Sequence, residues 1–444
     1  MMIIVAILLF ILVIKLFKKY NWEALLHPAF WFSFAWAIAL ISYFFIDLVG
    51  AVPIKNPELL NELMILLIVT VVAFLTFTTI PLPSRQSRPK VVNLAPVLPV
   101  PYILFALVGL GGALVNWIGL GATLAYNDNI RQQWLYKIPQ ITVITWYFYF
   151  LSYPVAFISG RTWMVCQIMG FPISAKKIFK FLLPLLSGFF WSIGTGGRQA
   201  LGLILLYFVV GGAFGIGWVI SNGYLISKVS MIRIAKKGMV FFVVFALFIG
   251  ITGLSRAKQQ GATASAFDEI WYIAPVGQLV SYMGLTIATH QAYGDPQRRD
   301  LSKTGPVSLA GLQDFGIRYI MGWKPLTVED TNPERFLAGS GQVLASATRD
   351  VFYDLQADFG FTGAILAVIL LVLISCVLFD YTRHIGYDRI IKLAPLVMMI
   401  MFWGYSHQFS LLMHNTLFWL ILSFSVWDVF RMFVLDRERI GDRK

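Results

Sequence analysis

Apolar segments of about 20 residues recur along almost the whole chain, and they constrain its fold more than any other feature. A transmembrane helix needs about 20 mostly apolar residues to cross the hydrocarbon core of a bilayer. Eleven segments fit, at residues 2–14, 28–49, 62–80, 99–119, 140–160, 178–194, 199–220, 238–254, 361–379, 393–408 and 410–430. Hydrophobic residues make up 58% of the 444, more than a soluble protein can bury. The sequence predicts an all-α polytopic membrane protein with about 11 transmembrane helices.

Positive charges alternate between the two sides of these segments. The loops on one side, together with the C-terminal tail, carry 22 of the 35 Lys and Arg residues. The short loops on the other side carry only Lys55, Arg131, Lys137 and Arg198. The positive-inside rule then predicts an outward N-terminus and a cytoplasmic C-terminus. The net charge of +13 is explained by this topology and by contact with anionic inner-leaflet lipids, so it does not indicate nucleic-acid binding.

One long segment, residues 255–360, lies outside the apolar pattern and faces outward in this topology. It contains 11 of the 22 acidic residues and nine basic ones. Loops of this length are usually functional. Its stretch 271–288 is apolar enough for a re-entrant or interfacial helix. The chain therefore divides into spans 1–8 with short loops (1–254), a long outer loop with amphipathic or re-entrant helices (255–360), and spans 9–11 with a basic tail (361–444).

Ionisable residues are almost absent from the middle of the predicted spans. Asp47 and Asp428 lie at span ends. Ion-coupled transporters and channels place such groups within their spans, so this absence lowers the expectation of a transporter and favours chemistry at the outer surface. The two cysteines, Cys166 and Cys376, cannot form a disulfide framework for the outer loop, and no Cys/His cluster suggests a metal site.

A glycine-rich turn at the outer junction of two spans is a candidate anion site. In the segment 194–200, Gly196 and Gly197 allow a tight turn, and the next helix is expected to begin near Arg198. A helix N-terminus beside an arginine suits a phosphate group. Alternatively, the segment is an ordinary turn with an arginine reaching the headgroups. Arg131 and Arg256 are expected on the same face at a similar depth.

The segment 349–360, which leads into the ninth span, contains three aspartates spaced by four residues. Asp350, Asp354 and Asp358 would line one stripe of a helix beside an apolar face, which predicts an amphipathic helix lying on the outer surface. Asp358 could instead cap a helix N-terminus. Asp350 and Asp354 are general-base candidates. The histidines His290, in the long loop, and His407, at an outer tip, are base candidates too, although a polar residue at such a place needs no catalytic role.

With these features the chain resembles the bacterial oligosaccharide repeat-unit polymerases, the Wzy-type O-antigen polymerases. The resemblance covers most of its length: many spans, a Gly-Gly-Arg at an outer junction, and one long outer loop late in the chain. The most specific local match is the run from Asp358 to Gly363 entering a span. An Arg-x10-Gly pattern runs from Arg349 to Gly360, although not on the loops where the family has it.

The resemblance implies a metal-independent membrane glycosyltransferase of the GT-C class, without a cofactor, at the periplasmic face of the inner membrane. Such enzymes transfer a glycan from undecaprenyl pyrophosphate to another lipid-linked repeat unit, and the family implies a chain-length regulator as a partner. Arginines can stabilise a pyrophosphate leaving group without Mg²⁺. We expect Arg198 and Arg256 to bind it, with Gly196 and Gly197 at the turn. Either Arg131 or Arg349 is expected to assist them. The candidates for the base are His290, Asp354 and His407.

Two other functions fit parts of the pattern. An O-antigen ligase shares the lipid-linked donor but uses a lipid A core as its acceptor. The ligase-like placement of a histidine late in the outer loop is not found here, because residues 330–360 contain no histidine. A lipid-linked oligosaccharide flippase would line a central cavity with charge and would lack a hundred-residue outer loop. A structural scaffold is the remaining alternative.

Overall fold

The structure is a computed structural model. It describes residues 1–48, 55–79, 98, 101–119, 145, 147–195, 199–221, 223–224, 226–227, 230, 232–239, 243, 284, 286–288, 290–291, 300–306, 308, 317–324, 336–337, 343–344, 350–385 and 416–441. These residues belong to two compact units. Unit 1 comprises residues 1–86, 243–384 and 395–418, and unit 2 comprises 87–242, 385–394 and 419–444.

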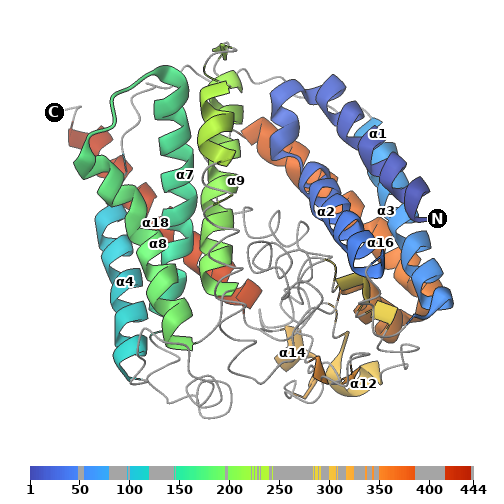
Figure 1. Ribbon diagram of the computed structural model, residues 1–444. Coiled ribbons are helices and arrows are strands. Elements are labelled where there is room, and N and C mark those ends of the chain that lie inside the picture. The colour runs from blue at the N-terminus through green and yellow to red at the C-terminus, as the bar shows by residue number, and fades with distance from the viewer. Residues whose placement is uncertain are drawn as a thin grey trace. The chain divides into compact units, whose positions relative to one another are not determined.

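Unit 1 is built on long helices, seen in blue and orange in Figure 1. Helix α1 (Met2–Tyr20) packs against α2 (Pro28–Leu48) and α3 (Pro57–Thr79), and the short 3-10 helix η1 (Asn21–Leu26) connects the first two. Helix α16 (Val351–Ile385) is the longest described element. The smaller elements are the helices α12 (Leu301–Thr304) and α14 (Ile317–Ile320) and the strands β1 (Phe336–Leu337) and β2 (Val343–Leu344). The antiparallel pairing of β1 with β2 departs from the expected all-helical fold.

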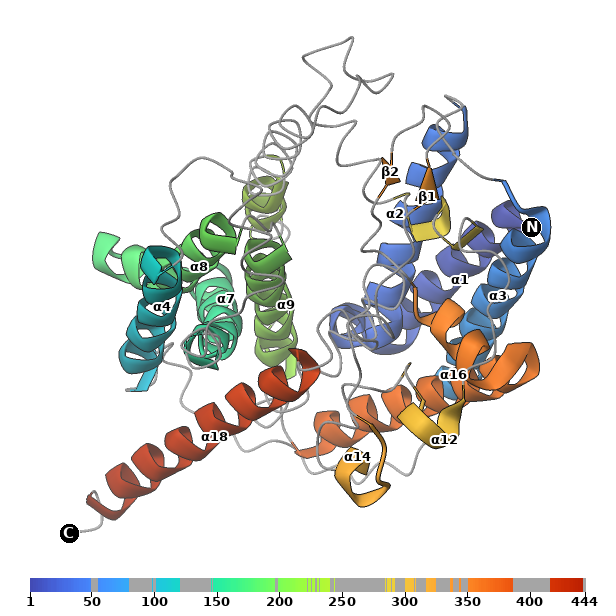
Figure 2. The same cartoon turned by 90° about the horizontal axis from the view of Figure 1, so that it is seen from below.

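Unit 2 contains α4 (Pro101–Gly119), α7 (Ser152–Met169), α8 (Ala175–Thr195) and α9 (Gln199–Ser221), which stand together in Figure 2. Helix α18 (Thr416–Gly441) joins them through aromatic contacts: the ring centroids of Trp427 and Phe105 are 5.1 Å apart. Phe424 contacts both Phe157 and Tyr207. Aromatic rings of α4, α7, α9 and α18 therefore pack against one another in the core of the unit.

Five of the described helices are long and apolar enough to cross a membrane: α2, α3, α4, residues 200–220 of α9 and residues 351–381 of α16. Large apolar side chains such as Leu48, Ile118 and Leu366 are well exposed on them. Such surface is unfavourable in water but suits a lipid environment. The expected helical membrane architecture is confirmed at this level, whereas the count of eleven spans stays a prediction.

Helices α2, α4, α8 and α9 match the predicted spans to within three residues. The largest difference is the segment expected at 140–160, because the structure has α7 at Ser152–Met169, with Arg161 within the helix. The helix ends where Gly170 adopts a left-handed conformation (φ 72°), a common helix terminus. The first segment is also longer than expected, because α1 continues to Tyr20 and has Lys18 and Lys19 in its last turn. There they complement the helix dipole. The predicted spans at 238–254 and 393–408 lie almost entirely outside the described residues.

Helices α7 and α9 approach each other through glycines. A Cβ at Gly211 would lie 2.0 Å from the Phe157 carbonyl oxygen, and one at Gly160 would lie 1.8 Å from the Phe208 carbonyl oxygen. Both distances are shorter than any real contact, so these positions exclude every side chain. Small residues at such crossings let transmembrane helices pack closely.

We expect Gly211→Ala to lower the thermal unfolding temperature of the detergent-solubilised protein, because the added methyl group pushes α7 and α9 apart. Gly111→Ala is the matched control, since a Cβ at Gly111 of α4 meets no atom within 4 Å. There the substitution is expected to leave stability unchanged or to raise it by about 0.5–1 kcal/mol through helix propensity. Equal unfolding temperatures for the two variants would contradict the close packing.

His27 lies between η1 and α2 and is buried, with 1% of its surface exposed. Its Nδ1 accepts a hydrogen bond from the Ala29 backbone N–H at 3.1 Å, and its ring contacts those of Tyr20 and Phe379. Burial, together with the charge of Lys19, lowers the pKa of His27 to about 3. The folded protein therefore holds this imidazole neutral.

We expect the folded state to lose stability as the pH falls from about 6.5 towards 3. In this window the unfolded chain protonates His27 and the folded chain does not, so unfolding is favoured by up to about 1.4 kcal/mol per pH unit. Thermal unfolding measured between pH 7.5 and 4.5 tests this. The His27→Asn variant should show a shallower decline, and an unchanged decline would contradict the assignment.

Candidate functional site

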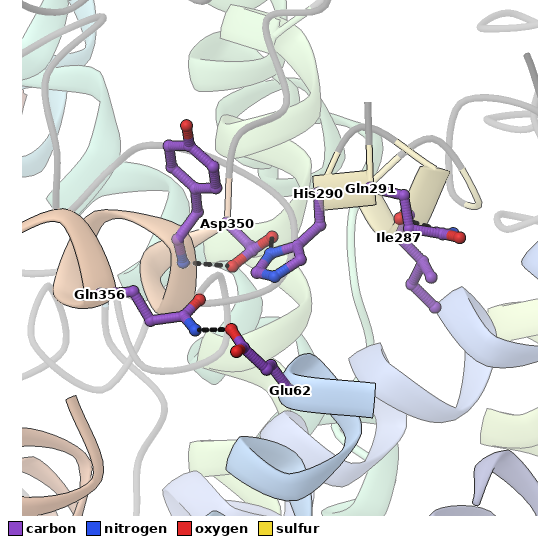
Figure 3. A network of polar contacts seen from close by, with 7 residues as sticks. Glu62, Ile287, His290, Gln291, Asp350 and Gln356 are labelled. Carbon is purple, nitrogen blue, oxygen red and sulfur yellow. Dashed lines mark hydrogen bonds and ion pairs between the residues drawn. The ribbon is translucent and has the colours of Figure 1, made fainter. Parts of the chain in front are cut away.

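The centre of the candidate site is a buried pair formed by His290 and Asp350. His290 Nδ1 lies 2.8 Å from Asp350 Oδ2, and both side chains have no exposed surface. The two residues are 60 positions apart in the sequence, and both lie in unit 1. Figure 3 shows the two side chains pointing toward each other. The structure thus brings together two of the general-base candidates expected from the sequence.

The pair determines which ring nitrogen of the histidine is available for chemistry. A carboxylate can only accept hydrogen bonds, so the Nδ1 that faces Asp350 carries a proton. In the neutral ring the lone pair then resides on Nε2. Nε2 is buried and has no hydrogen-bond partner among the described residues. A histidine oriented by a carboxylate, with its other nitrogen unpaired, has the arrangement of a general base.

Asp350 is itself held by the helix that it begins. Its Oδ1 accepts a hydrogen bond from the Tyr353 backbone N–H at 2.9 Å, which is an N-cap of α16. The ring of Tyr353 contacts the His290 ring edge-to-face, with centroids 5.8 Å apart. Cap and ring contact together fix the carboxylate and the imidazole relative to each other.

Gly360 interrupts α16 with φ 70° and ψ 175°. The positive φ favours glycine and separates a first segment, residues 351–359, which we name the arm, from the apolar helix that follows. Residues 351–358 are all buried. The expectation of an amphipathic helix on the outer surface was therefore wrong. The reason is that protein groups satisfy the polar stripe: besides the Asp350 contacts, Asp358 Oδ2 accepts the Ser308 backbone N–H at 2.7 Å.

Asp354, the other predicted acidic base, is fully buried in the arm. It lies one helical turn after Asp350 and makes interactions within the protein. Asp358 binds the backbone near residue 308, so this bond connects the arm to the loop before it. Of the three aspartates, Asp350 is the one that contacts a histidine in the described part of the chain.

Two glutamines extend the polar network of Figure 3. Gln291 Nε2 donates to the Tyr43 hydroxyl at 2.8 Å, and its Oε1 accepts the Asn56 backbone N–H at 3.2 Å. Gln356 Nε2 donates to Glu62 Oε2 at 2.6 Å. Sequence reasoning missed all four side chains; Glu62 was only the first residue of a predicted span. These bonds connect α2, α3 and the arm around the histidine.

The predicted anion-binding residues Arg131, Gly196, Gly197, Arg198, Arg256 and Arg349 lie outside the described residues, as does the base candidate His407. The helix that follows the glycine-rich turn is described. Helix α9 begins at Gln199, close to the expected start, and the Ser192 hydroxyl oxygen accepts the Leu201 backbone N–H at 3.0 Å in its first turn. Ser192 thus replaces the missing backbone partner of that N–H.

In the described ranges, no three His, Cys, Asp or Glu side chains lie together as a metal site would require. Compared with known proteins, the chain matches no protein-family model, no curated protein and no solved structure.

Proposed function

We propose that the protein is a membrane glycosyltransferase that polymerises undecaprenyl-pyrophosphate-linked oligosaccharide repeat units at the periplasmic face of the bacterial inner membrane. The observation that carries the proposal is the His290–Asp350 pair, in which a carboxylate orients a histidine and leaves Nε2 unpaired among the described residues. The pair joins the predicted outer loop to the residue that begins α16. The charge distribution predicts that this loop faces outward, and the resemblance implies that the lipid-linked substrates are used on that side.

In the proposed reaction an acceptor hydroxyl attacks the anomeric carbon of the donor sugar. The new glycosidic C–O bond forms, the bond from that carbon to the pyrophosphate oxygen breaks, and His290 Nε2 takes the hydroxyl proton. Undecaprenyl pyrophosphate leaves with the bonding electrons, and Arg198 and Arg256 stabilise its charge. Because His290 is buried, the acceptor hydroxyl reaches Nε2 only when the segments covering it move or when it enters between them.

Deleting the gene in its host tests the proposal. Loss of a polymerase should leave surface glycolipid that carries a single repeat unit, and the wild-type gene should restore the ladder of longer chains. Loss of a ligase would instead leave the lipid A core without any attached repeat unit. Loss of a flippase would abolish both the single-repeat glycolipid and the longer chains. Either of these last two results would contradict polymerisation.

A further inference from the structure

Gln356 has an unusual arrangement of its two polar atoms. Its Nε2 donates to Glu62 Oε2 at 2.6 Å, whereas its Oε1 is buried and has no hydrogen-bond partner in the described chain. The side chain is 3% exposed. Burying a carbonyl oxygen without a partner costs free energy, so such an atom requires an explanation. One explanation is a ligand that is not part of the chain.

Glu62 fixes the direction in which this oxygen points. Rotating the carboxamide by half a turn would place Oε1 of Gln356 against a carboxylate oxygen, and two acceptors would then face each other at hydrogen-bond distance. The Glu62 contact therefore keeps Nε2 on its own side and Oε1 on the other. Glu62 is only partly buried, in the second turn of α3. The pair thus combines a buried acceptor with a partly accessible acidic end.

Gln356 lies on the face of the arm that His290 contacts. Asp350, Tyr353 and Gln356 follow one another at intervals of three residues, so they share one helical face. His290 contacts the first two of them. One helical turn before His290, the hydroxyl of Thr286 is also buried and without a partner in the described residues. Among the described residues, Thr286 is thus a further one with a buried, unpaired polar atom in the helical segment that carries His290 or in the arm that His290 contacts.

We infer that Gln356 positions the acceptor saccharide: Oε1, oriented by Glu62, accepts a hydrogen bond from a hydroxyl of the sugar that reacts at His290. This inference rests on the proposed function. These two acceptors match a neutral ligand with several hydroxyl groups. One hydroxyl can donate a hydrogen bond to Gln356 Oε1, and another, the reacting one, can give its proton to His290 Nε2. Glu62 can accept a second hydroxyl at its accessible end.

Gln356→Leu tests the inference because it removes both polar atoms of the carboxamide at similar volume. We use lipid-linked repeat units extracted from host cells lacking this protein, and we measure transfer by the purified enzyme. We expect KM to rise about three- to tenfold, which is the size of effect expected for the loss of one hydrogen bond to the substrate. The unfolding temperature should be unchanged or higher. A KM within about twofold of wild type would overturn the inference.

Gln291→Leu is the matched control, because that carboxamide is paired at both ends within the protein. It should lower the unfolding temperature and leave KM unchanged. If Gln356 had only a structural role, Gln356→Leu would show these same two effects. The exchange variant Glu62→Gln/Gln356→Glu restores the amide–carboxylate pair in reverse and presents a carboxylate oxygen where Oε1 was. It should recover KM relative to Gln356→Glu alone, which sets two carboxylates against each other. No recovery would contradict the orienting role of Glu62.

A second measurement separates this inference from the proposed function. The repeat-unit oligosaccharide, released from its lipid, should raise the unfolding temperature of the wild-type protein and not that of Gln356→Leu. If wild type elongates glycans but Gln356→Leu behaves identically in both assays, the inference fails and the function stands. If wild type elongates nothing, the function fails, and the shift in unfolding temperature alone decides whether Gln356 binds the saccharide.

Discussion

Replacing His290 with asparagine should lower the rate of glycan transfer by about 10²–10⁴-fold, the usual contribution of a general base. Asparagine can still donate a hydrogen bond to Asp350 Oδ2, so the buried carboxylate keeps a partner and the cap of α16 is retained. It has no group at the position of Nε2. The variant should therefore fold and bind substrate while failing to take the proton. Transfer is measured as the initial rate of chain elongation.

Two further variants show whether the loss comes from the base. His27→Asn makes the same substitution at another buried histidine of unit 1, and we expect its transfer rate at neutral pH to stay within about twofold of wild type. Asp350→Asn can keep the cap through Oδ1 but presents an amide N–H to Nδ1 of His290. The lone pair then faces the amide and the proton moves to Nε2, so activity should fall as with His290→Asn. Full activity of His290→Asn would show that His290 is not the general base.

Neutralising Arg198 as Arg198→Gln is the second change with a large expected effect. We expect transfer to fall by about 10²–10³-fold, the scale for removing one group that stabilises developing charge. The reason is its sequence position, directly before the start of α9 at Gln199. An anion near this helix N-terminus would be stabilised by the backbone N–H groups and by the arginine together. The rate of release of undecaprenyl pyrophosphate measures the effect.

The charge variants can be designed so that misfolding does not explain the result. Arg198→Lys keeps the charge but loses the planar fork of donors, so it should retain part of the activity. Arg233→Gln is the control, because Arg233 is exposed and belongs to a loop predicted on the opposite side of the membrane. It should leave the rate unchanged. Undiminished transfer by folded Arg198→Gln would contradict the role in pyrophosphate binding.

Helix positions could be predicted from the sequence where apolar length decided them, as in α2, α4 and α9. The prediction was least accurate for α7, because a search for apolar residues stops at Arg161 while the helix continues to its glycine terminus at Gly170. The burial of the arm was also missed. Helical spacing locates a stripe of aspartates, but only the folded chain shows whether water or protein satisfies it.

The candidate site was predictable in its parts and not in its pairing. His290 and Asp350 were each base candidates because of their chemistry, yet their contact spans 60 residues and depends on tertiary structure. Glu62 and Gln356 gave no signal of their own, since an acid near a span end and a glutamine in a helix are ordinary features. Their relation rests on a contact across 294 positions.

The most direct measurement of the central claim supplies the purified protein in lipid vesicles with undecaprenyl-pyrophosphate-linked repeat units and no other acceptor. A ladder of longer glycans is the predicted result, and the ladder should be lost with His290→Asn. Transfer that begins only when lipid A core is added would identify a ligase and contradict polymerisation. No transfer under either condition, from protein shown to be folded, would contradict the glycosyltransferase assignment itself.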